Sequence, residues 1–204
     1  MIVKDTSIYY NYNRVMSYNA FINIIIGERG VGKSYGIKKW AIEHFKKTGR
    51  KFIYLRRYET ELKKLYKDNK FFKDISSDES FINDKLTCSG GSFYVNGCIA
   101  GYGIPLSKSS TFNSDPFPDV DIIIFDEFLI NNKTYHYMEN EPIQLLEFIE
   151  TVTRLRDIKV FMLGNNTTTV NPYFPYWNLS VPYNNDIKTF KDGLILVNYI
   201  KNEK

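Results

Sequence analysis

The chain has 204 residues and a mass of 24.0 kDa, which at about 150 residues per domain predicts one domain with at most a small addition. Its 43% hydrophobic and 25% charged residues are typical of a globular protein and exclude wholesale disorder. The apolar runs are far shorter than the roughly 18 residues of a membrane span, and no secretory signal pattern opens the chain. Two cysteines suit a reducing cytoplasm, and the net charge of +4 neither requires nor excludes nucleic acid.

The N-terminal part of the chain predicts an arm followed by a βαβ unit. Residues 1–20 lack a clear hydrophobic period, and we expect them to form a docking arm. Apolar residues over 21–26 predict a buried strand. Apolar residues at helical spacing then predict a helix from Lys33 to a stop at Gly49, and a second strand is expected over 52–55. This order predicts an α/β fold with a mostly parallel sheet flanked by helices.

Residues 27–34 read GERGVGKS and match the P-loop pattern G-x-x-x-x-G-K-[ST] completely. Glycines allow the backbone to curl so that its N–H groups face one phosphate chain, and the following helix N-terminus adds positive potential. Lys33 is expected to reach the β- and γ-phosphates of ATP, and the Ser34 hydroxyl to ligate Mg²⁺. The predicted nucleotide-binding residues are Gly27, Glu28, Arg29, Gly30, Val31, Gly32, Lys33, Ser34 and Tyr35, together with Asn165 from a later strand.

Basic residues concentrate in residues 38–73, which hold 13 Lys or Arg and four acidic residues, so this stretch carries +9 and the remainder −5. Arg56 and Arg57 follow the second strand, where contact with nucleotide phosphate and contact with a DNA backbone are both open. The surrounding lysines are candidates for DNA binding without sequence readout. Lys108 and Lys133 are alternative candidates, and a solvated surface is the structural alternative for the whole stretch.

The middle of the chain predicts a hairpin. The turn sequences SGG at 89–91 and NG at 96–97 lie between short runs of strand-forming residues, so a β-hairpin insertion is expected over 86–106. A Ser- and Pro-rich loop follows over 107–119.

A buried strand predicted over 120–125 ends at Asp126 and Glu127, which is the pattern of a Walker B motif. An aspartate at the carboxyl end of a strand is suited to hold Mg²⁺, so Asp126 is paired with Ser34 in this role. Glu127 is expected to act as the base that polarises an attacking water, which favours hydrolysis. An acidic turn that merely caps the strand is the alternative interpretation.

Glu141 and Pro142 predict the start of a helix that ends near Thr153 and is followed by Arg154 and Arg156. Arginines in this place are suited to stabilise the charge on a transferring γ-phosphate, an effect of roughly 10³–10⁵ in rate when an arginine finger is present. The alternative is that both arginines cap the C-terminus of the helix.

A strand over 158–163 leads into the turn sequence GNN, which contains Asn165. The Asn165 amide is suited to hold the attacking water or to sense the γ-phosphate, and a plain turn is an equal alternative. We assign residues 1–171 to an ATPase core, and 172–204 to a small β lid or linker that contains a strand segment at 188–199.

Six stretches between residues 24 and 174 resemble the DNA-packaging (encapsidation) ATPases of phi-29-like bacteriophages, in the order of that family. The P-loop and Walker B motifs occur throughout a superfamily, whereas RRY, IPLS and NPYF are more diagnostic. The matching stretches are IIIGERGVGKSY, KFIYLRRYETEL, AGYGIPLS, IIIFDEF, TVTRLR and TVNPYF.

The resemblance implies a P-loop fold of the additional-strand, catalytic-glutamate type, and ATP hydrolysis that moves double-stranded DNA into a preformed capsid. It places Arg154 at the trans-acting finger of a homo-oligomeric ring, a pentamer at the capsid portal in the host bacterial cytoplasm. Whether a structural RNA takes part is left open. Members of the family continue into a C-terminal nuclease-like domain, so we expect this chain to correspond to the motor domain alone.

Three other functions are considered. A helicase or conjugation-type translocase shares the nucleotide-binding residues but lacks the RRY, IPLS and NPYF sequences. A nucleotide-dependent loader or switch with little turnover is a second alternative, against which Glu127 and Arg154 argue. A kinase is the third, and no pocket for a phosphate acceptor is evident from the sequence.

Overall fold

The computed structural model describes residues 10–112, 117–131, 134–154, 156–168, 170–183 and 186–200. Within these residues, nine strands form one sheet in the order β3-β4-β5-β2-β6-β7-β1-β9-β8. The strands are β1 (Ile22–Gly27), β2 (Lys51–Arg56), β3 (Leu86–Ser89), β4 (Ser92–Val95), β5 (Cys98–Pro105), β6 (Val120–Asp126), β7 (Lys159–Asn165), β8 (Ile187–Phe190) and β9 (Ile195–Ile200).

The six central strands, β5-β2-β6-β7-β1-β9, all pair in parallel with their neighbours in this run. The outer strands β3, β4 and β8 pair in antiparallel fashion. This confirms the predicted mostly parallel α/β sheet. The α-helices are α1 (Tyr12–Met16), α2 (Lys33–Thr48), α3 (Glu59–Tyr66), α4 (Glu141–Thr153) and α5 (Tyr173–Trp177). Among the described helices, none has the length and hydrophobicity needed to cross a bilayer.

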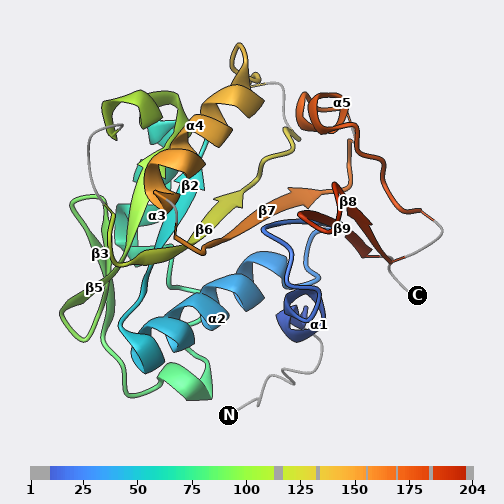
Figure 1. Ribbon diagram of the computed structural model, residues 1–204. Helices are drawn as coiled ribbons and strands as arrows, with labels where there is room; N and C mark the ends of the chain where they lie inside the picture. The colour runs from blue at the N-terminus through green and yellow to red at the C-terminus, as the bar shows by residue number, and fades with distance from the viewer. Residues whose placement is uncertain are drawn as a thin grey trace.

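Alternate residues of the central strands divide the core into two layers. Ile24 and Ile26 of β1 lie in one cluster with residues of α4 and α5, whereas Ile25 lies in the other with residues of α2. Successive strand side chains point to opposite faces, so strands covered on both faces are apolar throughout. Figure 1 shows the same layers, with α1 and α2 on one side of the sheet and α4 and α5 on the other.

Helix α2 is bounded by two glycines that adopt positive φ. Gly32 precedes it with φ 78°, and Gly49 ends it with φ 74°, where its backbone N–H bonds to the Phe45 carbonyl. The left-handed region costs a glycine nothing, which is why glycine is favoured at both places. The predicted helix and its stop at Gly49 are therefore confirmed.

The predicted hairpin is present and extends the sheet. Strands β3, β4 and β5 are joined by turns at Gly90-Gly91 and Asn96-Gly97, all of which have positive φ. Strand β5 then continues in parallel beside β2, from Phe52↔Gly101 to Arg56↔Pro105. The hairpin residues thus belong to the same sheet as the rest of the fold.

The C-terminal strands belong to the sheet as well, which corrects the expectation of a small lid over 172–204. Strand β9 pairs with β1 from Ile22↔Ile195 to Gly27↔Ile200, and β8 forms the edge beside β9. Tyr173, Phe174 and Trp177 of α5 pack in the same core cluster as residues of α4. The physical reason is that β1 is buried along its whole length and β9 covers the edge that would otherwise stay open.

Residues 10–20 pack on the domain, which corrects the expectation of a docking arm for the described part of that segment. The backbone N–H of Tyr10 donates to the Val31 carbonyl at 3.1 Å, and the buried Tyr12 hydroxyl donates to the Lys33 carbonyl at 2.8 Å. A Cβ atom at position 36 would lie 2.7 Å from the Tyr10 carbonyl oxygen, so Gly36 permits this approach. The segment therefore supports the P-loop.

Candidate nucleotide-binding site

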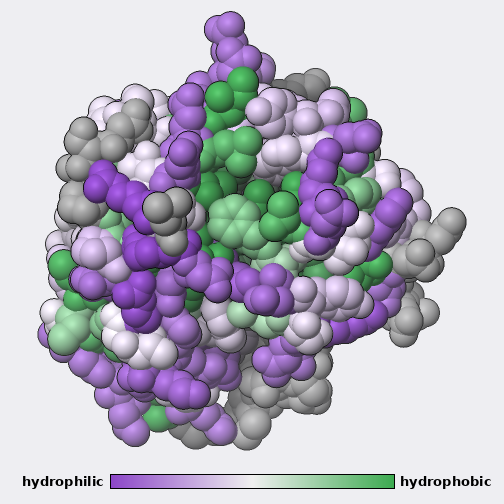
Figure 2. All heavy atoms as spheres, viewed as in Figure 1, coloured by the Kyte–Doolittle hydropathy of each residue, from purple (hydrophilic) through white to green (hydrophobic). Residues whose placement is uncertain are grey.

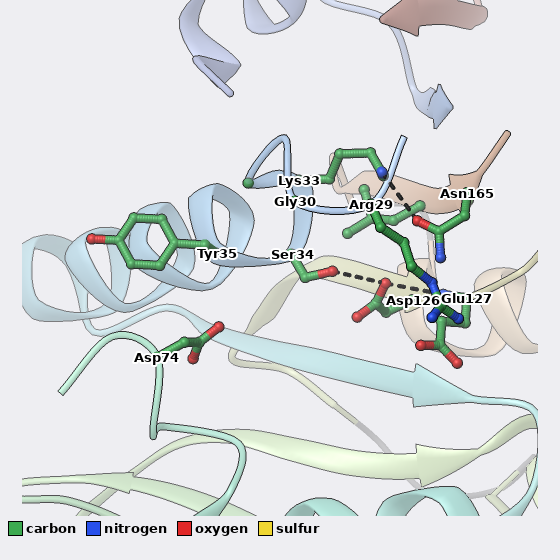
Figure 3. Close-up of a pocket in the computed structure, with 12 residues that line it drawn as sticks. Arg29, Gly30, Lys33, Ser34, Tyr35, Asp74, Asp126, Glu127 and Asn165 are labelled. Carbon is green, nitrogen blue, oxygen red and sulfur yellow. Dashed lines mark hydrogen bonds between the residues drawn. The ribbon is translucent and has the colours of Figure 1, made fainter. Parts of the chain in front are cut away.

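Four parallel strands, β2, β6, β7 and β1, end at one edge of the sheet, and this edge carries the predicted site. The register places Gly27 of β1 beside Asn165 of β7, and Asp126 of β6 beside Leu163 of β7. A pocket of about 400 Å³ lies at this edge (Figure 3). It is lined by Arg29, Gly30, Gly32, Lys33, Ser34, Tyr35, Asp74, Asp126, Glu127, Leu163, Gly164 and Asn165.

Lys33 is buried and fully engaged within the P-loop. Its Nζ donates to the carbonyls of Gly27 at 2.8 Å and Glu28 at 2.7 Å, and to Oδ1 of Asn165 at 3.2 Å. Burial lowers the pKa of Lys33 to about 8, against the opposing effect of the Asp126 carboxylate. The structure therefore joins Asn165 to the P-loop lysine, and the ammonium group is charged at neutral pH.

Ser34 and Asp126 meet at the position that the sequence predicts for Mg²⁺. The Ser34 hydroxyl donates to Asp126 Oδ1 at 3.1 Å, and the Glu127 backbone N–H donates to the same oxygen at 3.0 Å. The Tyr54 hydroxyl donates to Oδ2, and burial followed by the Asp126 charge raises the pKa of Tyr54. The ligands available here are a hydroxyl and a carboxylate, and the described residues contain no cluster of three His, Cys, Asp or Glu able to hold a metal. Oxygen ligands of this kind fit Mg²⁺, which usually takes one or two protein ligands beside substrate phosphates.

Glu127 follows Asp126 in an unusual backbone conformation and pairs with Arg56. Its φ is 59°, and its side chain is about half exposed to the pocket. The buried Arg56 guanidinium lies 2.7 Å from Glu127 Oε2. Burial alone would lower the pKa of Arg56, but the surrounding Tyr54, Asp126 and Glu127 raise it. Arg56 is thus a buried, paired cation at the nucleotide edge, which favours the nucleotide alternative over DNA contact.

Arg57, the next residue after Arg56, is also buried, with 2% of its surface exposed. Its Nε and Nη2 atoms each lie 2.8 Å from a carboxylate oxygen of Glu141. A guanidinium this deeply buried offers no surface to a DNA backbone, which argues against the DNA alternative at Arg57. In a sequence, two arginines after a strand look alike, because their burial is decided by distant residues such as Glu141.

The two arginines after α4 differ in the structure. The Arg156 guanidinium donates to the carbonyls of Phe117, Pro118 and Val120 at 2.7 to 2.9 Å, so it ties the end of α4 to the loop before β6. Arg154 caps α4 with φ 38° and is exposed. Within the described residues, its side chain makes no hydrogen bond or ion pair. Arg156 has a structural role, and Arg154 is the one that reaches solvent.

The other predicted loop residues have different surroundings. Arg29 extends toward Asp126 and Glu127, whereas the Tyr35 side chain points away from them along α2 (Figure 3). Val31 contributes a carbonyl to Tyr10. The sequence did not predict two residues at this site, Tyr54 and Asp74, because a tyrosine in an apolar strand and an aspartate in a polar loop carry no distinctive signal.

Of the two remaining DNA candidates, the structure describes Lys108. Lys108 is paired with Glu59 at 2.5 Å on the surface, and Lys133 lies outside the described residues. A second hollow, of about 430 Å³, is instead lined by four lysines and one aspartate. We call this set the lysine row: Lys64, Lys67, Lys70 and Lys73, with Asp68 beside them.

The fold and this site define a P-loop nucleotide-binding protein of the α/β class. Residues 4–200 match the profile of the podovirus DNA encapsidation protein (Gp16) family, and the chain belongs to this family. The DNA packaging proteins of Bacillus phages phi29 and B103 are each 38% identical to it, over 94% and 89% of this chain. These matches cover 56% and 55% of the two relatives, so the chain spans just over half of their length.

Solved structures agree with this assignment. The N-terminal domain of the DNA packaging ATPase from bacteriophage phi29 has a TM-score of 0.83 and 36% identity, covering 94% of this chain and 96% of that one. A chain of the phi29 genome packaging motor assembly matches equally well over 57% of its length. The large terminase ATPase domain of Thermus phage P74-26, at TM-score 0.54 and 10% identity, shares the fold.

Proposed function

We propose that this chain hydrolyses ATP and couples the hydrolysis to the movement of double-stranded DNA into a viral capsid. The observation that carries the proposal is the meeting of Ser34, Asp126 and Glu127 beside the P-loop, at distances near 3 Å, in a chain of this family. The relatives are described as DNA packaging proteins and as a packaging ATPase within a motor assembly.

The chain's own residues divide the work of hydrolysis. The P-loop amides and the Lys33 ammonium bind the phosphates, and Ser34 with Asp126 would hold Mg²⁺, which supplies positive charge to the phosphate oxygens when bound. Glu127 orients the attacking water and accepts its proton. The Arg56 guanidinium lies 2.7 Å from Glu127 Oε2 and so positions this carboxylate beside the pocket.

The strand order supports an assignment to the additional-strand, catalytic-glutamate type. Strand β7 lies between β1, which carries the P-loop, and β6, which carries Glu127. Asn165 at the end of β7 already contacts Lys33, so we assign it the role of sensing the γ-phosphate. The same placement is expected in helicases and conjugation-type translocases, so it does not distinguish between these functions. The family assignment favours capsid packaging over the helicase alternative.

We further propose that Arg154 acts on the nucleotide of a neighbouring copy in a ring. Its exposure and its unfavourable positive φ support a role that requires an outward-facing guanidinium. Figure 2 shows apolar residues gathered between α4 and α5, and Ile143 and Tyr176 of these helices are 40% and 50% exposed. Exposed apolar patches are typical of contact surfaces. The pentamer and the portal attachment remain predictions from the resemblance, which leaves open whether a structural RNA takes part.

For DNA contact we propose the lysine row in place of Arg56 and Arg57. Lys67, Lys70 and Lys73 have no ion-pair partner within the described residues, and the three-residue spacing places them with Lys64 around one hollow. Several unpaired cations that converge in this way suit a phosphate backbone, which is bound by charge without base readout.

The test of the proposed function is the steady-state ATPase rate measured against protein concentration, with and without duplex DNA. A motor predicts turnover that rises with concentration and with DNA. Negligible turnover under all these conditions would contradict the proposal and favour a nucleotide-dependent switch.

A further inference from the structure

A buried polar cluster lies behind the Walker B turn and takes no part in the nucleotide contacts described above. It consists of Arg57, Glu141 and Tyr173, which we call the Arg57 cluster. Glu141 has no exposed surface. Its two carboxylate oxygens accept hydrogen bonds from Nε and Nη2 of Arg57, both at 2.8 Å. They also accept from the Tyr173 hydroxyl at 2.6 Å and from the Met138 backbone N–H at 2.9 Å. Both oxygens of the carboxylate are thereby satisfied in the interior.

The cluster is bonded directly to the backbone that carries Glu127. Arg57 Nη2 donates to the Phe128 carbonyl at 2.7 Å, and Nη1 donates to the Glu127 carbonyl at 3.4 Å. Glu127 has φ 59°, a conformation that a residue with a side chain adopts at a cost and that its surroundings must impose. The Glu127 backbone N–H donates to the Asp126 carboxylate at 3.0 Å, and the Glu127 carbonyl accepts from Arg57. Hydrogen bonds therefore fix both ends of this residue.

The same cluster joins the turn to two helices. Glu141 is the first residue of α4, and Tyr173 is the first residue of α5. The Arg57 guanidinium is also enclosed by the Phe125 and Tyr137 rings, at 5.5 and 4.9 Å from their centroids. A bidentate pair in such an interior resists separation, because removal of either partner leaves a buried charge without compensation.

We propose that Arg57, Glu141 and Tyr173 are positioning residues that set the Walker B turn, and with it the Glu127 carboxylate, in the geometry that hydrolysis requires. The inference rests on the proposed ATP hydrolysis and adds residues that touch neither nucleotide nor metal. A displacement of about 1 Å at a reacting group is enough to cost about 100-fold in rate, so a loosened turn reduces turnover strongly. Nucleotide affinity changes little, because the P-loop has its own supports.

The experiment compares Glu141→Gln and Tyr173→Phe with the unsubstituted chain. It measures kcat, KM, the Kd of a fluorescent ATP analogue, and Tm. We expect kcat to fall about 10-fold or more for Glu141→Gln and by a smaller factor for Tyr173→Phe, with Kd within about twofold. The matched control is Phe72→Leu, a fully buried site in the core cluster on the other side of the sheet, which lowers Tm without changing kcat.

The outcomes separate the inference from the proposed function. Unchanged kcat in both cluster variants of an active chain overturns the inference alone. A loss of kcat in Phe72→Leu equal to that in Glu141→Gln, at equal loss of Tm, also overturns it, because general destabilisation then explains the result. Absence of ATPase in the unsubstituted chain overturns the proposed function and this inference together. The Tyr173→Phe side chain keeps its shape, so the test holds even where Glu141→Gln fails to fold.

Discussion

The nucleotide edge and the lysine row are both polar, but they are organised in opposite ways. At the nucleotide edge, Lys33, Asp126 and Arg56 are buried and each is held by partners at 2.7 to 3.4 Å. In the lysine row the side chains stand around an open hollow, and none of the four lysines forms an ion pair in the described part of the chain. Fixed partners give geometric precision, whereas unpaired lysines give charge that can follow a moving polyanion.

The largest effect on kcat is expected for Arg154→Ala. This exposed arginine lies in neither region and is proposed to reach the nucleotide of a neighbouring copy. Loss of an arginine finger predicts a fall in kcat of about 10³-fold or more. The ATPase rate of the parent chain should also depend on protein concentration, and that of the variant should not. Mixing Arg154→Ala with Lys33→Ala chains should restore turnover. Failure of this rescue would show that the arginine acts within its own chain.

Glu127→Gln tests the nucleotide edge at the residue proposed to activate water. The substitution keeps the size of the side chain but removes the basic carboxylate, so kcat should fall about 100-fold or more. Binding of a fluorescent ATP analogue should stay within a few-fold of the parent, because the P-loop contacts are unaffected. A strong loss of binding instead would mean that Glu127 holds nucleotide and does not activate water.

The pH dependence of nucleotide binding tests the buried lysine. The pKa of Lys33 is about 8, so the ammonium form that binds phosphate is fully present well below pH 8 and is lost as the pH rises through that value. The Kd should therefore rise about 10-fold between about pH 7 and pH 9. Lys33→Ala should bind weakly with no such trend. A flat profile in the parent would show that Lys33 stays charged.

The smallest effect per residue is expected in the lysine row. Replacement of all four lysines by glutamine should weaken binding to a duplex of roughly 20–30 base pairs and reduce the slope of log K against log salt by about 0.9 for each phosphate that is no longer neutralised. The ATPase rate without DNA should not change. The matched control replaces the exposed Lys188 and Lys191 at the opposite end of the sheet order. Equal losses of duplex binding in both variants would mean that the lysine row contributes only general surface charge.

The sequence predicted the strands and loops whose signals are local. The P-loop, the strand before Asp126 and the helix that stops at Gly49 each depend on residues close together in the chain, and all three were found where expected. The errors concern long-range partners. Nothing local indicates that β9 covers β1 or that Tyr12 lies against α2. Burial of Arg57 is likewise decided by Glu141, 84 residues later.

The position of β1 has a consequence for the order in which the chain is made. The strand that leads into the P-loop is synthesised long before its two neighbours, β7 and β9, which begin at Lys159 and Ile195. Until both have left the ribosome, six consecutive apolar or amide residues of β1 have two unpaired edges, which favours association with other chains. Folding of the nucleotide edge is therefore a late event, and truncation before β9 should yield aggregated protein even though every P-loop residue is present.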